Sequence, residues 1–139
     1  METLTTFDSF TEARDHLKEV LDAAEEGRPV VVSRSDTRAA VVDADRLRSL
    51  IASQLPSHAQ LVAEAEGWSA FLPGIPVAAD GATYVEALDE LVDALQEYAA
   101  DWNDHLRHAP NHKGNWALVQ LVSLSDDDQL KEWLVSAAA

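Results

Sequence analysis

The first third of the chain has the hydrophobic pattern of a helix. Between Ser9 and Gly27, apolar residues recur at steps of three, four, three, one and three, which places them on one face of a helix. They are Phe10, Ala13, Leu17, Val20, Leu21 and Ala24. Ser9 and Glu12 have the spacing of a capping box, and Gly27 followed by Pro29 is a stop signal. The pattern predicts one helix from Ser9 to Gly27.

Short apolar runs flank and follow that helix. β-Branched residues and turn residues alternate over residues 30–42, which is typical of a hairpin. Asp43 is placed to cap a second helix that carries Leu47, Leu50 and Ile51, and Pro56 ends it. The predicted elements are a strand at 3–7, a strand at 30–32, a turn at 33–37 and a return strand at 39–42.

A different pattern begins after Pro56. Alternating residues predict strands at 59–64 and 68–72, with Trp68, Ala70 and Leu72 on one face of the second. Thr83 is placed to cap a long helix with apolar residues on one side and acids on the other. The remaining predicted elements are an irregular connection at 73–76, a strand at 77–79, a turn at Asp80 and Gly81, a polar loop at 107–114, a fourth strand at 116–124, and a short helix after Ser125 that carries Leu130, Trp133 and Leu134.

These elements predict an α+β chain of two small domains, residues 1–55 and 56–139, with the boundary near 54–58. Domains of this size bury only about 60% of their unfolded surface, so dimerisation would be a natural remedy.

Charge is distributed unevenly along the chain. The formal net charge is −15. Residues 1–55 hold seven bases against eleven acids, whereas residues 56–139 hold three bases against fourteen acids. Residues 28–48 alone carry five arginines and three aspartates. Such asymmetry favours different partners for the two halves, although solvated acidic faces would also explain it.

Several classes of function are not favoured. The chain has no cysteine for a thiolate zinc site or a disulfide, and neither a secretory signal nor a membrane-spanning apolar run, so we expect a cytoplasmic protein. His105 and His108 have helical spacing, but Pro110 separates them from His112, so a metal site is not expected. The acids of the long helix lie on its polar side and favour a solvated face over acid–base catalysis. We expect no cofactor and no enzymatic activity.

Four segments of the first half follow the order and spacing of a known family: residues 9–17 (SFTEARDHL), 21–34 (LDAAEEGRPVVVSR), 40–42 (AVV) and 45–47 (DRL). Together they resemble the Phd/YefM (prevent-host-death) antitoxin domain. The resemblance implies a dimeric β-α-β-β-α domain that binds its own operator, with Arg14 and Arg34 at the positions that grip DNA, and a toxin captured by a C-terminal region. The small and basic residues usual after the hairpin arginine are Ser35, Asp36 and Thr37 here, and Arg38 is the next base.

Two segments of the second half follow the pattern of another family: residues 66–76 (EGWSAFLPGIP) and 81–88 (GATYVEAL). They are similar to a HicB-type antitoxin domain. The resemblance implies a fold like part of a double-stranded-RNA-binding domain, β-β-β-α-β, that mainly covers a toxin.

Each predicted site has a simpler alternative. Arg14 is either a DNA contact or a solvated arginine, and its neighbours three and four residues away include no acid for an ion pair. Arg34 and Arg38 flank the hairpin turn and could approach phosphates or stay solvated. Lys18 is a weaker DNA candidate because Asp22 lies one helical turn away.

The predicted partner-binding residues lie in the second half. Trp68, or its neighbour Phe71 on the opposite face, is a potential anchor, although core packing would also explain a tryptophan. Glu86, Glu90 and Asp93 would form an electronegative surface for a basic partner.

Taken together, the residues and resemblances predict a type II antitoxin. It would neutralise a cognate toxin, a basic ribonuclease, by direct binding, and would repress its own operon by binding operator DNA as a dimer. The alternative is an acidic, dimeric protein-interaction module that does not bind DNA.

Overall fold

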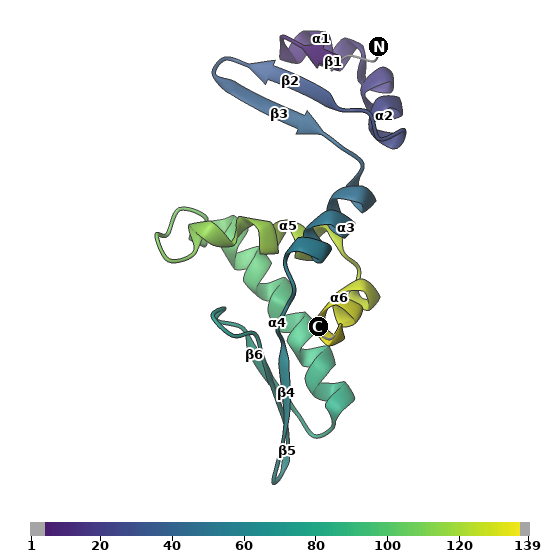
Figure 1. The fold of residues 1–139 in the computed structure, drawn as a ribbon. Coiled ribbons are helices and arrows are strands. Elements are labelled where there is room, and N and C mark those ends of the chain that lie inside the picture. The colour runs from purple at the N-terminus through teal and green to yellow at the C-terminus, as the bar shows by residue number, and fades with distance from the viewer. Residues whose placement is uncertain (1–4, 137–139) are drawn as a thin grey trace. The chain divides into compact units, whose positions relative to one another are not determined.

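The computed structural model describes residues 5–136 and divides into two compact units, Met1–Ser49 and Leu50–Ala139. Each unit contains a three-stranded sheet together with helices (Figure 1). The predicted α+β class is therefore confirmed. The division falls within helix α3, Ala44–Gln54.

The sheet of the first unit has the order β1-β2-β3. Strand β1, Thr5–Phe7, pairs in parallel with β2, Val30–Arg34, which pairs antiparallel with β3, Thr37–Val41. The first two residues of the predicted strand at 3–7 lie outside the described residues. As expected, Asp43 caps α3, because its Oδ2 accepts a hydrogen bond from the Arg46 amide at 3.0 Å.

The predicted helix from Ser9 to Gly27 is interrupted at His16. Helix α1 spans Phe10–Asp15 and α2 spans Leu17–Glu25, and His16 lies between them with φ −118°. Its amide donates to the Ala13 carbonyl, three residues back, while its Nδ1 donates to the Glu12 carbonyl oxygen at 2.9 Å. The side chain has thus replaced the backbone as the partner of that carbonyl, and the ladder of the helix breaks. Sequence periodicity does not detect this exchange.

Both ends of this helical segment were predicted correctly. The Ser9 hydroxyl accepts a hydrogen bond from the Glu12 amide at 3.1 Å. Gly27 has φ +80°, the left-handed conformation that commonly ends a helix.

The hairpin turn is tighter than predicted. Pairing continues to Arg34 opposite Thr37, so only Ser35 and Asp36 form the turn, and Ser35 has φ +54°. The predicted turn at 33–37 was therefore too long, because Ser33 and Thr37 belong to the strands.

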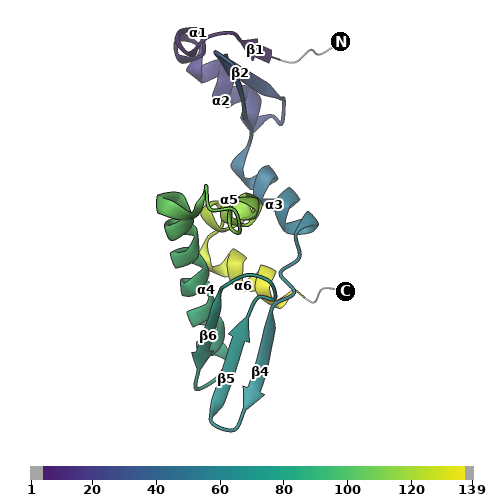
Figure 2. The same ribbon diagram turned by 90° about the vertical axis from the view of Figure 1, so that its left-hand side faces the viewer.

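The second unit begins with an antiparallel sheet of order β4-β5-β6. The strands are β4, Gln60–Glu64, β5, Gly67–Phe71, and β6, Ala78–Gly81. Asp80 and Gly81 lie in β6 rather than in the predicted turn. Helix α4, Tyr84–Asp101, packs on one face of this sheet (Figure 2).

Thr83 caps α4 as predicted. Its hydroxyl accepts a hydrogen bond from the Glu86 amide at 3.1 Å, and the Glu86 carboxylate accepts one from the Ala82 amide at 2.9 Å. The expected face of Trp68, Ala70 and Leu72 is also present, since all three belong to the core under α4.

Residues 116–124 form a helix, and the predicted fourth strand was wrong. Helix α5 spans Trp116–Leu124. Its buried residues are Leu118, Val119, Leu121 and Val122, whose spacings of one, three and four are helical. The run is almost wholly apolar, so its periodicity is hidden in the sequence. The unit is therefore β-β-β-α-α-α rather than β-β-β-α-β-α.

The last helix, α6, spans Asp127–Val135 and was predicted with the wrong cap. Asp126 is its N-cap and forms a reciprocal capping box with Gln129, at 2.8 and 2.9 Å. Ser125 instead donates its hydroxyl to the Leu121 carbonyl at 2.6 Å, at the end of α5. The predicted apolar residues Leu130, Trp133 and Leu134 are buried as expected.

The predicted polar loop at 107–114 is confirmed for residues 107–112, which form turns, and short helical turns lie on either side of them. A π-helix, η1, spans Trp102–Leu106, and a 3-10 turn, η2, spans Lys113–Asn115. The Tyr98 hydroxyl hydrogen-bonds with His112 Nδ1 and accepts from the Asn115 side chain, both at 2.9 Å. This partly buried network links the segment to α4.

Candidate functional site

The two hairpin arginines lie on opposite faces of the first sheet. Arg38 pairs with Ser33, and Arg34 pairs with Thr37. Directly paired residues share a face and successive residues alternate, so Arg34 and Arg38 point to opposite sides. Both are exposed, and no ion pair is recorded for either in the described part of the chain. The two arginines of one hairpin therefore do not share a face of the sheet.

Arg14 has an acidic partner that helical spacing does not reveal. Its Nε lies 3.5 Å from the carboxylate of Asp15, the next residue, and its guanidinium carbon lies 5.9 Å from the centre of the Phe10 ring. The expectation that Arg14 lacks an ion pair is wrong, because the adjacent residue, and not one three or four positions away, supplies the carboxylate. The pair is exposed and therefore weak, so Arg14 can still reach a ligand.

Lys18 forms the predicted ion pair with Asp22. The Nζ–Oδ2 distance is 2.7 Å, and this hydrogen bond raises the pKa of Lys18. Lys18 is therefore less available to a phosphate than the hairpin arginines.

Arg46, a weaker candidate for DNA binding, has a structural role. Its guanidinium donates to the carbonyls of Ala24 and Glu25 at 3.4 and 2.9 Å. These are carbonyls of the last turn of α2, where a cation also interacts favourably with the helix dipole. Arg28, one of the five arginines of residues 28–48, pairs with Glu26 at 3.1 Å. Part of the positive charge of residues 28–48 is thus already engaged in contacts within the first unit.

The first unit exposes a large part of the apolar set predicted for its helix. Phe10, Leu17 and Leu21 are 60%, 54% and 56% exposed, whereas Val20 and Ala24 are buried. The buried core of this unit consists mainly of Phe7, Val20, Ala23 and Val30. So many exposed large apolar residues over so small a core are typical of a protein contact surface.

The acids of α4 form an exposed row. Glu90, Asp93, Glu97 and Asp101 follow one another at steps of three and four residues and are all exposed. Glu86 also caps the helix, and Asp89 pairs with Lys131 at 2.7 Å. Of the predicted partner-binding acids, Glu90 and Asp93 lie in this row, and Glu86 has a role in the fold.

Trp68 and Phe71 lie on opposite faces of the second sheet. Trp68 faces the core and packs edge-on against Tyr84, with ring centroids 5.4 Å apart. Phe71 is exposed on the other face. The structure therefore does not bring the two predicted anchors together.

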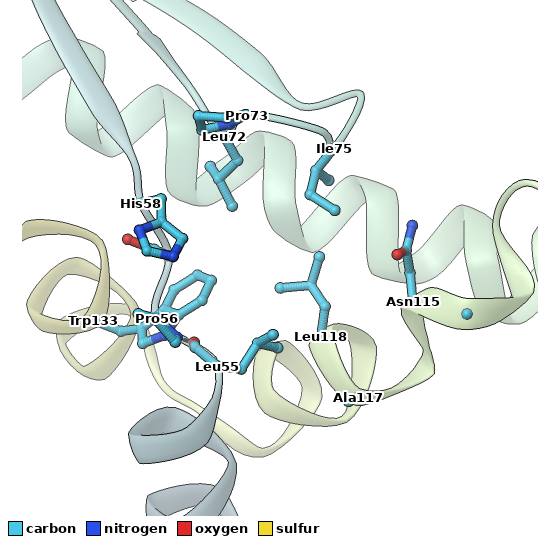
Figure 3. Close-up of a pocket in the computed structure, with 12 residues that line it drawn as sticks. Leu55, Pro56, His58, Leu72, Pro73, Ile75, Asn115, Ala117, Leu118 and Trp133 are labelled. Atoms are coloured by element: carbon cyan, nitrogen blue, oxygen red, sulfur yellow. Dashed lines mark hydrogen bonds between the residues drawn. The ribbon is translucent and has the colours of Figure 1, made fainter. Parts of the chain in front are cut away.

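A cavity of about 210 Å³ lies within the second unit. The side chains of Leu55, Leu72, Ile75 and Leu118 converge on it, and Trp133 forms part of its wall (Figure 3). The Trp133 indole donates to the Leu55 carbonyl at 2.8 Å. The lining is mainly apolar, so the cavity offers packing rather than a catalytic arrangement.

The three histidines considered as metal ligands have separate partners. His105 Nδ1 lies 3.1 Å from Asp104 Oδ2, His108 Nε2 accepts a hydrogen bond from Arg107 Nε at 3.4 Å, and His112 Nδ1 hydrogen-bonds with the Tyr98 hydroxyl. Within residues 5–136, no group of three histidines or acids is placed to hold a metal ion. The helices of the same residues include none that could span a membrane.

Two comparisons relate the chain to antitoxins. Residues 4–136 match the PHD-like family, described as antitoxins of RelE/RelB toxin–antitoxin systems. The fold is similar to a crystal structure from Syntrophomonas wolfei subsp. wolfei, described as the antitoxin part of a proposed toxin/antitoxin system. That similarity has a TM-score of 0.76 at 23% identity and covers 95% of this chain and 96% of the other. A comparison with curated proteins finds no match.

The family match extends through both units without a break, and the structural match covers nearly the same length. Neither separates a Phd/YefM part from a HicB-like part, so that finer division remains a prediction. The family match alone spans far more than half of the sequence. The chain therefore belongs to the PHD-like family of antitoxins of RelE/RelB toxin–antitoxin systems.

Proposed function

We propose that this antitoxin neutralises a basic ribonuclease toxin by direct binding through the unit Leu50–Ala139. The same chain would dimerise through Met1–Ser49 and repress its own operon by binding operator DNA.

The charge of the second unit carries the proposal for the toxin. From residue 50 onward the chain has fourteen acids and three bases, and one of those bases, Lys131, is already bound to Asp89. A ribonuclease needs a cationic surface to hold RNA, because phosphates dominate binding to nucleic acids. An electronegative protein surface that covers this site would be complementary to it and would exclude RNA.

The exposed apolar residues of the first unit support dimerisation. Phe10, Leu17 and Leu21 are each more than half exposed, and burying them against a second copy would remove a large apolar area from water. The same contact would supplement a core that is small for an independent domain.

DNA binding is proposed through Arg34 and Arg38, with Arg14 as an additional contact. Neither hairpin arginine has a recorded ion pair in the described residues, so both can reach phosphates. Since they point to opposite sides of the hairpin, only one of the two positions can face a given DNA surface squarely. Asp36 lies in the turn between them and would oppose a phosphate.

A mobility-shift titration with the upstream region tests the DNA proposal. Arg34→Ala and Arg14→Ala should each weaken binding, and the apparent affinity of the unmodified chain should fall steeply with salt. Arg46→Ala is not a suitable control, because Arg46 supports the fold. Unchanged binding by both variants would remove the claim.

An acidic dimeric interaction module without DNA binding remains the second candidate. Asp36 at the hairpin tip and the net excess of acids in the first unit favour it. A DNA-binding isotherm that shows no salt dependence and no preference for the upstream sequence would establish it.

A further inference from the structure

The second sheet has one covered and one uncovered face. Leu61, Ala70 and Ala79 are direct neighbours across the three strands and lie in the core beneath α4. Residues next to them in each strand must therefore point to the opposite side. We call this side the outer face.

The outer face has an apolar centre. Phe71 lies between Gln60 and Ala78, and Val62 lies in the next row. Phe71 and Val62 are 36% and 43% exposed. A half-exposed aromatic residue beside an exposed valine is unusual on a sheet face that only meets water, because antiparallel sheets normally present polar residues there.

Beside this apolar centre, the carboxylates of Glu64 and Asp80 both lie within hydrogen-bond distance of one hydroxyl. The Ser69 Oγ lies 2.6 Å from Glu64 Oε1 and 3.1 Å from Asp80 Oδ1. A hydroxyl has one proton, so it can donate to only one of the two carboxylates at a time. No ion pair is recorded for Glu64 or Asp80 among residues 5–136. Two like charges are thus held close together without a cation.

This combination restricts what can cover the outer face. Phosphates of a nucleic acid would be repelled by the paired acids. A second copy of the same face would oppose acids with acids if it docked symmetrically, as is usual for dimers. An arginine side chain fits both features, because its methylene stem covers apolar surface while its guanidinium takes carboxylates.

We propose that the outer face of β4-β5-β6 is the docking surface for an arginine-bearing segment of the cationic toxin. The arginine head lies between Glu64 and Asp80, and its neighbours pack on Val62 and Phe71. This assignment rests on the proposed function and specifies which surface performs it.

The acidic row of α4 cannot belong to the same contact. Helix α4 packs on the covered face of the sheet through residues such as Leu91 and Leu95, so its exposed acids, including Glu90 and Asp93, point away from the outer face. The two acidic surfaces can therefore be tested separately by equal changes in charge.

The test measures by calorimetry how tightly the full chain binds the small protein encoded by the adjoining reading frame. The two proteins are first co-expressed, and they are then separated and titrated against each other. The double variant Glu64→Gln with Asp80→Asn should weaken the Kd by about tenfold or more. Glu97→Gln with Asp101→Asn is the matched control, which removes the same charge from exposed acids of α4 that are not predicted partner-binding residues, and it should change the Kd by less than about threefold. Phe71→Thr should also weaken binding by about tenfold. The strand should be preserved in this variant, because threonine has a high β propensity.

Circular dichroism of each variant ensures that lost affinity is not lost folding. If the sheet variants bind the toxin as tightly as the unmodified chain does, only this assignment of the surface is overturned, and the proposed function stands. A larger loss for the α4 variant than for the sheet variant also overturns it and moves the contact to α4. If the unmodified chain does not bind the toxin, both this assignment and the proposed function fail.

Discussion

Substitution of Gly81 by alanine should destabilise the second unit more than its small size suggests. Gly81 ends β6 where that strand passes beneath the first turn of α4. A Cβ built on it would overlap the Ala87 amide nitrogen and would lie 2.8 Å from both Ala87 Cα and the Glu86 carbonyl carbon. All three atoms belong to the helix backbone, so no flexible side chain can move aside.

The expected cost follows from that geometry. Overpacking a well-packed site typically costs about 1–3 kcal/mol, and a rigid backbone neighbour favours the upper end of the range. Gly114→Ala is the matched control, because a Cβ there meets nothing within 4 Å. Where the backbone accepts alanine, such a change stabilises by about 0.4–1 kcal/mol by restricting the unfolded chain. The two variants should therefore differ by about 3 kcal/mol.

Urea unfolding followed by tryptophan fluorescence measures this difference. All four tryptophans lie in residues 50–139, so the signal reports on the second unit alone. With a slope of about 1–2 kcal/mol per molar urea, the midpoints should differ by about 1.5–3 M. Equal midpoints for Gly81→Ala and Gly114→Ala would refute the close packing of α4 on β6.

Three further predictions concern other contacts. Asp126→Ala should destabilise the second unit by about 1 kcal/mol through loss of the α6 cap, and Asp126→Asn should restore most of it in the same urea assay. Trp133→Phe leaves the carbonyl of Leu55 without its indole donor and should cost about 1–3 kcal/mol, measured by circular dichroism during thermal unfolding. The hydrogen bond to the Glu12 carbonyl, followed by nearby acids, raises the pKa of His16 above 6.5, so an NMR titration should place its midpoint above that value. Because the folded pKa is the higher one, the stability contributed by His16 should be complete below pH 6.5 and should be lost as pH rises through the folded pKa, and His16→Gln should abolish this dependence.

Local signals in the sequence determined most of the element boundaries. Ser9, Asp43 and Thr83 cap helices as predicted, because capping depends on a side chain and an amide only three residues apart. The apolar run of α5 was misread because a helix buried on most sides and a buried strand look alike without polar residues to mark a period. His16 was missed because its ring competes for a carbonyl that periodicity assigns to the backbone.

From the sequence, the candidate sites could be predicted as individual residues but not as arrangements in space. Sequence reasoning identified Arg34, Arg38 and Phe71, but register decides that the two arginines point to opposite sides. The paired carboxylates of Glu64 and Asp80 were not anticipated, since sixteen residues separate them and only strand pairing brings both to one hydroxyl. The alternation of residues along each strand indicates which of them share a face. The sequence does not indicate the register between strands, which decides which side chains become neighbours.

Gly27 and Arg46 form a single energetic unit, although nineteen residues separate them. Gly27 adopts a left-handed conformation, and a Cβ there would lie 2.7 Å from the Arg46 guanidinium that closes the end of α2. Because glycine has no side chain, residue 27 can adopt the left-handed conformation and also leaves room for the arginine. The effects of substitutions at these two positions will consequently not add, because once the arginine is removed a side chain at residue 27 incurs only the conformational penalty.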